Sequence, residues 1–228
     1  ELMEIYCKNF DYLHSWCDMT LANSSKQMGF ISLGKYSTGK KVQEYSFDKK
    51  ITKNHLPFLI NIFGTKLIII VNKLYYLINM LKAHKKVLLH NFIFPSRSNL
   101  FYFSMFGKKG VIEHQVLIPK ENAKQYLKDL MIIIEKNRPI IALCHLKVFK
   151  GQGMFLRFDG SGYCLALHFY NNSIGLSTLD EIDLINKNYR CKVNLSTRSA
   201  EQLPTLNRPP IHTSAFEIDL QVKQTLLL

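Results

Sequence analysis

The sequence predicts an α+β fold, an antiparallel sheet with helices packed on one face. Segments 111–119, 141–149 and 162–169 alternate apolar and polar side chains with the period of two that is typical of strands. A stripe of apolar residues at helical spacing, from Glu121 to Arg138, separates the first two segments. The chain has 228 residues, 47% of them hydrophobic, which is enough to bury one large core.

The predicted sheet has one apolar side and one sparsely polar side. The helix 121–138 would cover the apolar side, and Pro139 would end that helix. The polar side would carry Glu113 and Gln115, then His145, Lys147 and Phe149, then Cys164, Ala166 and His168. Since no neighbouring segment covers it, this side is where we expect a ligand to bind. The alternative is an ordinary sheet with one solvated face and no ligand.

Upstream of this sheet the pattern is less regular. Residues 1–20 are predicted to form one or two short strands that end near Trp16. Residues 21–55 are polar and are predicted as a long loop, with one strand near Phe30 to Leu33. Residues 84–110 are rich in aromatic side chains and end in a Gly-Lys-Lys-Gly turn before the first strand of the sheet.

Residues 56–83 are predicted to be helical, with a break near Gly64. Asn and Lys interrupt this window, and its longest unbroken apolar run is Leu67 to Val71. A helix needs about 20 nearly continuous apolar residues to span a bilayer. We therefore expect a buried or membrane-surface helix here, and not a transmembrane one.

Downstream of the sheet, Ser177 or Thr178 is predicted to cap a helix that runs to about Lys187. Residues 190–195 are predicted as a strand. From Ser196 the pattern is lost, and several prolines rule out a long element before a short tail at 216–228.

The net charge of +13 is unevenly distributed. Residues 1–110 hold 16 Lys and Arg against 6 Asp and Glu, a surplus of +10, whereas residues 111–228 hold 14 against 11, a surplus of +3. Such a basic half suits a nucleic acid, an anionic membrane surface or an anionic substrate, or reflects only a Lys- and Asn-rich composition. Since no RNA- or DNA-binding motif accompanies the charge, we expect no nucleic-acid partner.

The five cysteines are odd in number and scattered, without a CxxC pair. This pattern argues against a disulfide framework or a zinc site and favours a reducing, cytoplasmic compartment. Catalytic motifs such as GxSxG, HExxH and GxGxxG are absent, so the sequence assigns no catalytic residue and no metal ligand. The candidates for binding are Gln115 as a hydrogen-bonding group, Lys147 as a holder of negative charge and Phe149 as an aromatic wall.

An ordered series of segments resembles the substrate domain of FAD-linked oxidases of the decaprenylphosphoryl-ribose oxidase and aldonolactone oxidase type. The series is DYLHSWCD, FIFPSRSNLFYFSMFGKKG, EHQVLIP, ALCHLKVF, GYCLALHFY and LDEIDLI, and it covers roughly residues 1–200. The resemblance implies the cap-domain fold of these enzymes. No single segment is specific, and the similarity depends on their order and spacing.

The resemblance also implies roles for individual residues. Gln115 and Lys147 would bind substrate beside the flavin, and Phe149 and Trp16 would line the pocket. Cys164 stands where the family often has Asn or Thr. His168 replaces the family's usual Asp.

The family also has a Lys-containing segment that reaches the flavin. The corresponding text after Asn194 is LSTRSAEQL, which contains no Lys. Asn194 or Thr197 would take the place of that lysine, and Arg198 would match the family's Arg, so Asn194 and Arg198 are the predicted cofactor contacts.

In this family a separate N-terminal domain holds most of the FAD, and no counterpart of it is expected in these 228 residues. The resemblance implies a cap domain at 1–192 and a remnant of the return to the FAD domain at 193–228. The implied function is the substrate-binding part of an FAD-dependent oxidoreductase that oxidises a CH–OH group of a sugar or a phosphorylated sugar-lipid. A separate FAD-domain chain and a peripheral membrane contact are the expected partners.

Two alternatives remain open. The chain could be a non-catalytic relic or binding module of the same fold, because the expected lysine and the FAD domain are missing. A basic nucleic-acid-binding domain is less favoured, since only the charge supports it.

Overall fold

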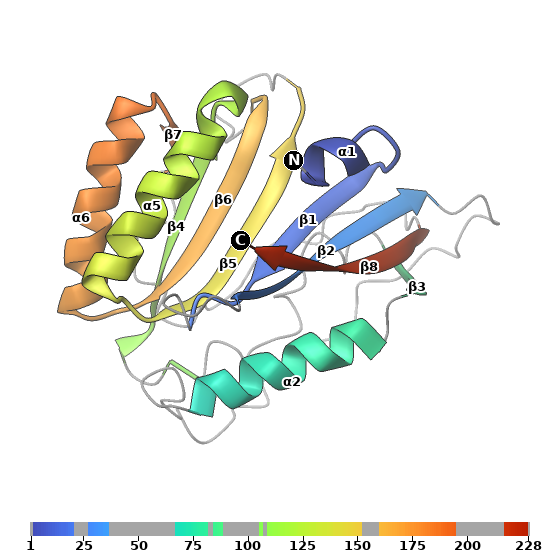
Figure 1. The fold of residues 1–228 in the computed structure, drawn as a ribbon, viewed down its shortest axis with the longest axis horizontal. Coiled ribbons are helices and arrows are strands. Elements are labelled where there is room, and N and C mark those ends of the chain that lie inside the picture. The colour runs from blue at the N-terminus through green and yellow to red at the C-terminus, as the bar shows by residue number, and fades with distance from the viewer. Residues whose placement is uncertain are drawn as a thin grey trace, which may run out of the picture.

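The computed structural model describes residues 2–20, 27–36, 67–81, 84–88, 105–106, 109–151, 160–194 and 217–227. They form one eight-stranded sheet with the strand order β3-β8-β2-β1-β5-β6-β4-β7 (Figure 1). Every pairing between neighbouring strands is antiparallel. The predicted α+β fold with an antiparallel sheet is therefore confirmed.

The elements have the following bounds. The strands are β1 (Tyr12–Cys17), β2 (Gln27–Tyr36), β3 (His84–Leu88), β4 (Val111–Ile118), β5 (Ile141–Phe149), β6 (Gly162–Tyr170), β7 (Lys192–Val193) and β8 (Glu217–Leu227). The helices are α1 (Leu2–Tyr6), α2 (Leu67–Leu81), α5 (Ala123–Asn137) and α6 (Ser173–Asn188), with a 3₁₀ turn at Lys120–Asn122. Among the described helices, none is long and apolar enough to cross a membrane.

The main hydrophobic core lies between the sheet and the pair α5 and α6, which Figure 1 shows side by side over β4 and β6. Val116, Leu167 and Tyr126 are each completely buried in it. The odd-numbered residues of β6 and the even-numbered residues of β4 face this core, as the alternation of the sequence predicts.

Helix α5 follows the predicted stripe closely. Its buried positions include Tyr126, Leu130 and Ile134, which recur every three or four residues. The helix ends because Arg138 adopts the left-handed conformation, with a φ of 50°, and donates its backbone N–H to the Ile134 carbonyl at 2.8 Å. Pro139 then prevents continuation, so this prediction is confirmed.

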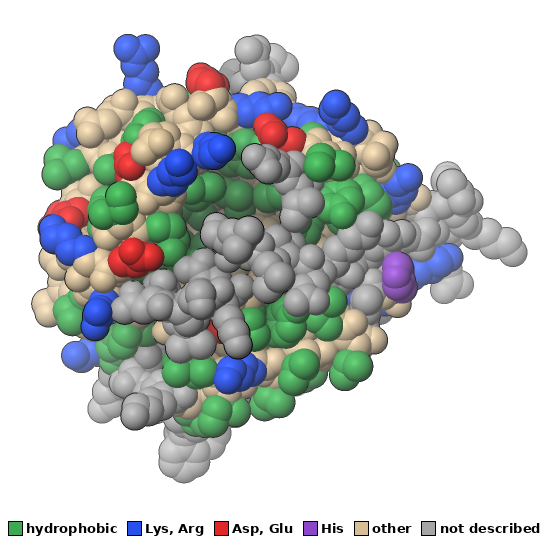
Figure 2. Space-filling model, viewed as in Figure 1, with side chains coloured by type: hydrophobic (Ala, Val, Ile, Leu, Met, Phe, Trp, Pro, Cys, Tyr) green, Lys and Arg blue, Asp and Glu red, His purple; other side chains and the backbone are tan. Residues whose placement is uncertain are grey.

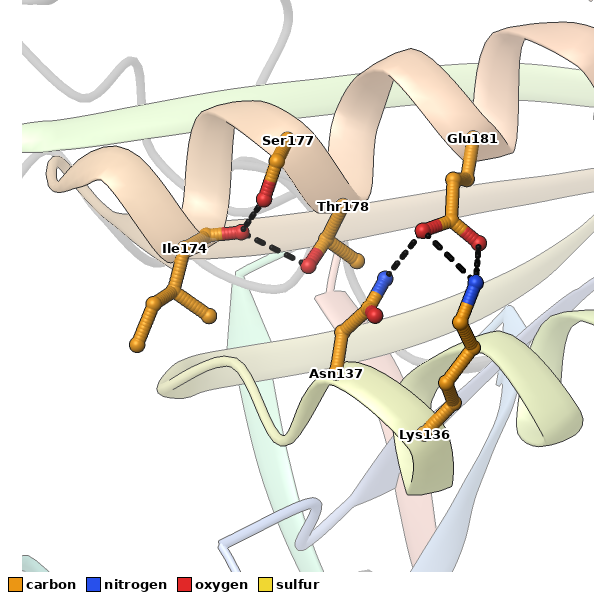
Figure 3. A network of polar contacts seen from close by, with 6 residues as sticks. All are labelled: Lys136, Asn137, Ile174, Ser177, Thr178 and Glu181. Atoms are coloured by element: carbon orange, nitrogen blue, oxygen red, sulfur yellow. Dashed lines mark hydrogen bonds and ion pairs between the residues drawn. The ribbon is translucent and has the colours of Figure 1, made fainter.

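Helix α6 begins earlier than predicted. Its N-cap is Asn172, whose side chain accepts a 2.8 Å hydrogen bond from the Gly175 backbone N–H. Ser177 and Thr178 are not caps: they lie inside the helix, and their hydroxyls donate to the Ile174 carbonyl at 3.1 and 2.7 Å (Figure 3). The cap prediction was therefore wrong. Asn172 precedes Ser177 and Thr178 in the chain, and its side chain can cap a helix as well as theirs can.

Glu181 ties α6 to α5. Its carboxylate accepts hydrogen bonds from Lys136 and Asn137, both at 3.0 Å, as Figure 3 shows. Lys136 is largely exposed, so this pair adds little to the stability and mainly fixes how the two helices lie side by side.

Helix α2 corrects the prediction that helices pack on one face only. Its Tyr75 ring makes an edge contact with Trp16, at 5.2 Å between centroids, and its Asn72 donates a 2.8 Å hydrogen bond to Asp18. Trp16 points away from the core under α5, so α2 lies on the opposite face of the sheet (Figure 1). The polar side is thus covered by a helix over its β1–β2 half.

The two ends of the chain also differ from the predictions. Strand β1 ends at Cys17, as predicted for residues 1–20, but the short helix α1 precedes it, which was not predicted. The tail at 216–228, for which no element was predicted, contains β8, which pairs with both β2 and β3 inside the sheet. The predicted break near Gly64 lies outside the described residues, and a separate unit from residue 193 onward stays a prediction.

Candidate functional site

The polar side of the sheet brings together residues from strands that are distant in the sequence. Residues that are directly opposite in neighbouring strands share a face. One row across the sheet contains Ser32, His14, Lys147 and Cys164, and the next contains Phe30, Trp16, His145, Ala166 and Gln115. The predicted site residues Gln115, Lys147 and Cys164 therefore share one face and lie in two adjacent rows.

The amide of Gln115 is held on both of its sides. Its Nε2 donates to Cys164 Sγ at 3.5 Å, and its Oε1 accepts a 2.7 Å hydrogen bond from Asn194 Nδ2. The Asn194 backbone N–H also donates to the Gln115 carbonyl at 2.9 Å, which prolongs the pairing of β7 with β4. Asn194, predicted as a cofactor contact, thus sits directly beside the predicted substrate residue Gln115.

Lys147 is the cation at the centre of this face, and Lys192 lies at its β7 edge. It stands in register with His14 on one side and with Cys164 on the other, and it is partly exposed. Burial, assisted by the charge of Lys147, lowers the pKa of His14 to about 3. Burial also lowers the pKa of His145 well below its ordinary value, and His14, Lys147 and His168 add to that shift. Both imidazoles are therefore neutral near pH 7.

The two histidines lie together, with ring centroids 5.6 Å apart. A neutral imidazole can donate a hydrogen bond with one nitrogen and accept one with the other. His14, His145 and Lys147 therefore offer one positive charge and several hydrogen-bonding atoms within one small area, without mutual charge repulsion.

The surroundings of Cys164 disfavour ionisation of its thiol. Burial raises the pKa of its thiol to about 11, against the opposing influence of Lys147 and Gln115. The thiol therefore stays protonated at neutral pH, whereas nucleophilic attack requires the thiolate.

Further along the same face, Glu113 and His168 form a pair at 3.8 Å. Burial opposes ionisation of Glu113, but the hydrogen bond and charge of His168, with the charge of Lys147, outweigh it and lower the pKa of Glu113. A carboxylate, that of Glu113, therefore lies close enough to Lys147 to feel its charge. The resemblance places the family's Asp at the position of His168, not of Glu113.

The two aromatic residues predicted to line the site have different positions. Trp16 is only 2% exposed and lies under α2, stacked on Phe30 with 5.3 Å between ring centroids. Phe149 is partly exposed and stands two residues beyond Lys147 on the same face of β5. Phe149 can therefore border a ligand on Lys147, while Trp16 forms the closed, α2-covered flank of the site.

Two residues of this site, His14 and Ser32, were missed in the sequence, and His145 was placed on the polar side without a binding role. The strand period offered a signal for His14, because residues two apart in a strand share a face and His14 is two residues from Trp16. The sequence could not show that β1 pairs with β5, and this pairing places the rings of His14 and His145 side by side. Arg198 lies outside the described residues.

Among the described residues, no three His, Cys, Asp or Glu side chains are placed to hold a metal ion. The chain matches no protein-family model, and no curated protein is measurably similar to it in sequence. The functional argument therefore depends on the geometry of the polar face.

Proposed function

We propose that this chain is the substrate-binding part of an FAD-dependent oxidoreductase that acts on a CH–OH group of a sugar or a phosphorylated sugar-lipid. The FAD would be held mainly by a domain outside these 228 residues. The flavin would take the hydride from the carbinol carbon, while this chain binds and orients the substrate.

The observation that supports the proposal most directly is the grouping of Gln115, Lys147, Cys164 and Asn194 on one face. The first three were expected to touch substrate, and Asn194 was expected to touch the cofactor. Substrate and cofactor residues must adjoin for hydride transfer, since the reacting atoms have to approach to about 3–3.5 Å. Their adjacency is thus the arrangement that the proposed reaction requires.

Each polar group has a task in this proposal. The Lys147 ammonium would hold a phosphate or an ionised hydroxyl, because it is a positive charge beside two neutral rings. The Gln115 amide, fixed by Asn194, would orient the sugar hydroxyls. Among the described residues Asn194 is the one that carries a cofactor prediction, so this chain would contribute little to FAD affinity.

A binding test can use the single tryptophan of the chain as its signal. Trp16 is in register with His145, next to Lys147, so a ligand there is expected to change its fluorescence. Titration with ribose 5-phosphate should give saturable binding that Lys147→Gln weakens by about tenfold, the effect of losing one charge-assisted hydrogen bond. Lys128→Gln, an exposed change on α5, is the matched control. Equal affinity in Lys147→Gln and wild type would remove Lys147 from the site.

A redox test separates the proposal from its alternative, a non-catalytic binding module. The alternative is favoured by one observation: the segment after Asn194 lacks the lysine that the family brings to the flavin. The chain would be mixed with an FAD-domain protein and ribose 5-phosphate under anaerobic conditions. Bleaching of the oxidised flavin absorbance supports an oxidoreductase, while saturable binding without bleaching supports the binding module.

A further inference from the structure

Helix α2 presents an uninterrupted apolar stripe to solvent. The stripe consists of Leu67, Ile70, Leu74, Leu77, Ile78 and Leu81. Each of these side chains is at least 46% exposed, and Leu81 is 86% exposed. Their spacing of three or four residues places them on one side of the helix. Figure 2 shows hydrophobic side chains gathered along the lower part of the molecule, where Figure 1 places α2.

The opposite side of α2 is fixed to the sheet, so the stripe cannot turn inward. Asn72 is buried and donates to Asp18 at 2.8 Å, and Ile68 is buried beside Phe106. Tyr76 and Met80 pack against Trp16 and Phe30. The helix therefore buries a mixed face that includes an amide and exposes a mainly apolar one, the reverse of an ordinary surface helix.

The segment of sequence that contains the stripe carries charge of a single sign. Residues 49–112 contain 11 Lys and Arg and no Asp or Glu. Within the described part, Lys73 is exposed on α2 itself. Lys85 on β3 is also exposed and lies on the α2 side of the sheet, because Val87, two residues further along the strand, packs under α2.

We infer that this stripe, which we call the α2 stripe, docks on an anionic lipid bilayer. A helix with an exposed apolar face and flanking lysines inserts that face at the boundary between headgroups and acyl chains, while the lysines bind anionic headgroups. The α2 helix would lie in the plane of the membrane. The inference does not depend on the redox role proposed above.

The charge pattern also favours a lipid surface over a second copy of this chain. A two-fold dimer through the α2 stripe would bring the same acid-free, lysine-bearing segment of both copies together. Like charges would then face each other across the interface, without an acidic group from the segment to neutralise them. An anionic membrane supplies the opposite charge that this segment lacks.

Flotation of the whole chain with lipid vesicles tests the inference. Vesicles of phosphatidylcholine with about one third phosphatidylglycerol should bind the chain at least tenfold more strongly than phosphatidylcholine alone, since each lysine near the surface adds to the attraction. Raising the salt concentration should weaken the binding.

The variants Leu74→Asp and Leu77→Asp should lose at least nine tenths of vesicle binding. The matched control is Ile132→Asp, because Ile132 is equally apolar and 63% exposed but lies on α5, on the other side of the sheet. The double variant Lys73→Gln, Lys85→Gln should lose the preference for phosphatidylglycerol, and Lys124→Gln, Lys128→Gln on α5 should keep it. Matching circular dichroism and thermal unfolding would show that each variant is folded, and Leu74→Ser replaces Leu74→Asp if the latter unfolds.

Two results would overturn the inference. One is unchanged vesicle binding in both Asp variants. The other is a dimer in sedimentation that Leu74→Asp converts to a monomer, together with no vesicle binding by the wild-type chain, which would assign the α2 stripe to a second copy. Ribose 5-phosphate binding is measured separately, so failure of the polar-face proposal is distinguishable from failure of this one.

Discussion

Asn194 and Gln115 are joined twice, by a 2.7 Å hydrogen bond between their side chains and a 2.9 Å hydrogen bond between their backbones. The first fixes the rotation of the Gln115 amide, so that its Nε2 points to Cys164. The second ties the residue after β7 to the edge of β4. A residue at the last strand of the sheet thus controls the orientation of a central group on the polar face.

Replacing Asn194 with Ala is expected to loosen the Gln115 amide. The partly buried Oε1 of Gln115 would lose its donor, at a cost of about 1 kcal/mol in the free energy of unfolding. Affinity for ribose 5-phosphate should fall several-fold because the amide no longer has one orientation. Urea unfolding and the Trp16 titration measure the two effects. Asn188→Ala, an exposed position at the end of α6, should change neither.

The stability of the chain should fall as the pH is lowered from about 7 to about 5. The pKa of His14 is about 3 in the folded chain, below its ordinary value of about 6.5 in the unfolded chain, so the unfolded chain binds the proton first. His145 acts in the same direction. Above pH 6.5 each neutral ring makes its full contribution to the free energy of unfolding, and this contribution is lost as the pH falls towards the pKa of the folded state.

Unfolding lets each ring bind at most one extra proton, so each ring adds at most about 1.4 kcal/mol per pH unit to the slope of the free energy of unfolding. The variants His14→Gln and His145→Gln should each flatten the pH dependence, measured by urea unfolding at several pH values. His84→Gln, on the exposed edge strand β3, is the control and should leave the slope as in wild type. An equal slope in all four proteins would show that His14 and His145 are not held neutral.

Asn72 is expected to be critical for the position of α2. Asp18 Oδ1 accepts hydrogen bonds from the Thr20 backbone and hydroxyl and from Asn72, while its buried Oδ2 has no partner within the described part of the chain. Asn72→Leu would remove a donor from a buried carboxylate, which costs about 2–3 kcal/mol. Thermal unfolding measures the loss.

The control for Asn72→Leu is Asn79→Leu on the same helix. The Asn79 side chain donates to the Tyr75 carbonyl at an exposed site, where water can replace the bond, so the change should cost less than about 1 kcal/mol. If both variants lose the same stability, the Asp18 hydrogen bond does not hold α2 on the sheet.

Tyr126→Phe is expected to destabilise the packing of α5 on α6. The buried Tyr126 hydroxyl donates to Asn186 Oδ1 at 2.8 Å, and Asn186 Nδ2 contacts His114 Nε2 at 3.2 Å. Without the hydroxyl, a buried amide oxygen is left without its donor, at a cost of about 1–3 kcal/mol. Chemical denaturation of the two proteins gives the difference.

Tyr189→Phe tests the same substitution at the same pair of helices. Tyr189 donates to Asp129, but both residues are partly exposed, so water can hydrate the carboxylate after the change. The loss should therefore be smaller than for Tyr126→Phe. A larger loss at Tyr189 would contradict the role given to the buried network.

Local periodicity determined the central part of this protein. The strands around Gln115, Lys147 and Cys164 and the helix that covers them could be predicted, because a period of two or of 3.6 decides which side chains become buried together. The same alternation placed those three residues on one face before the sheet was known.

Only the tertiary structure decided the rest. Helix α2 has apolar residues on every side, so its sequence could not show which side meets the sheet. Asp18 and Trp16, more than 50 residues earlier, decide that through Asn72 and Tyr75. Strand β8 could be described only as a tail from the sequence, because its hydrogen-bonding partners, β2 and β3, are distant in the chain. The neutral pair His14 and His145 likewise depends on the pairing of β1 with β5, because burial and neighbouring charge, which set a pKa, exist only after distant strands have come together.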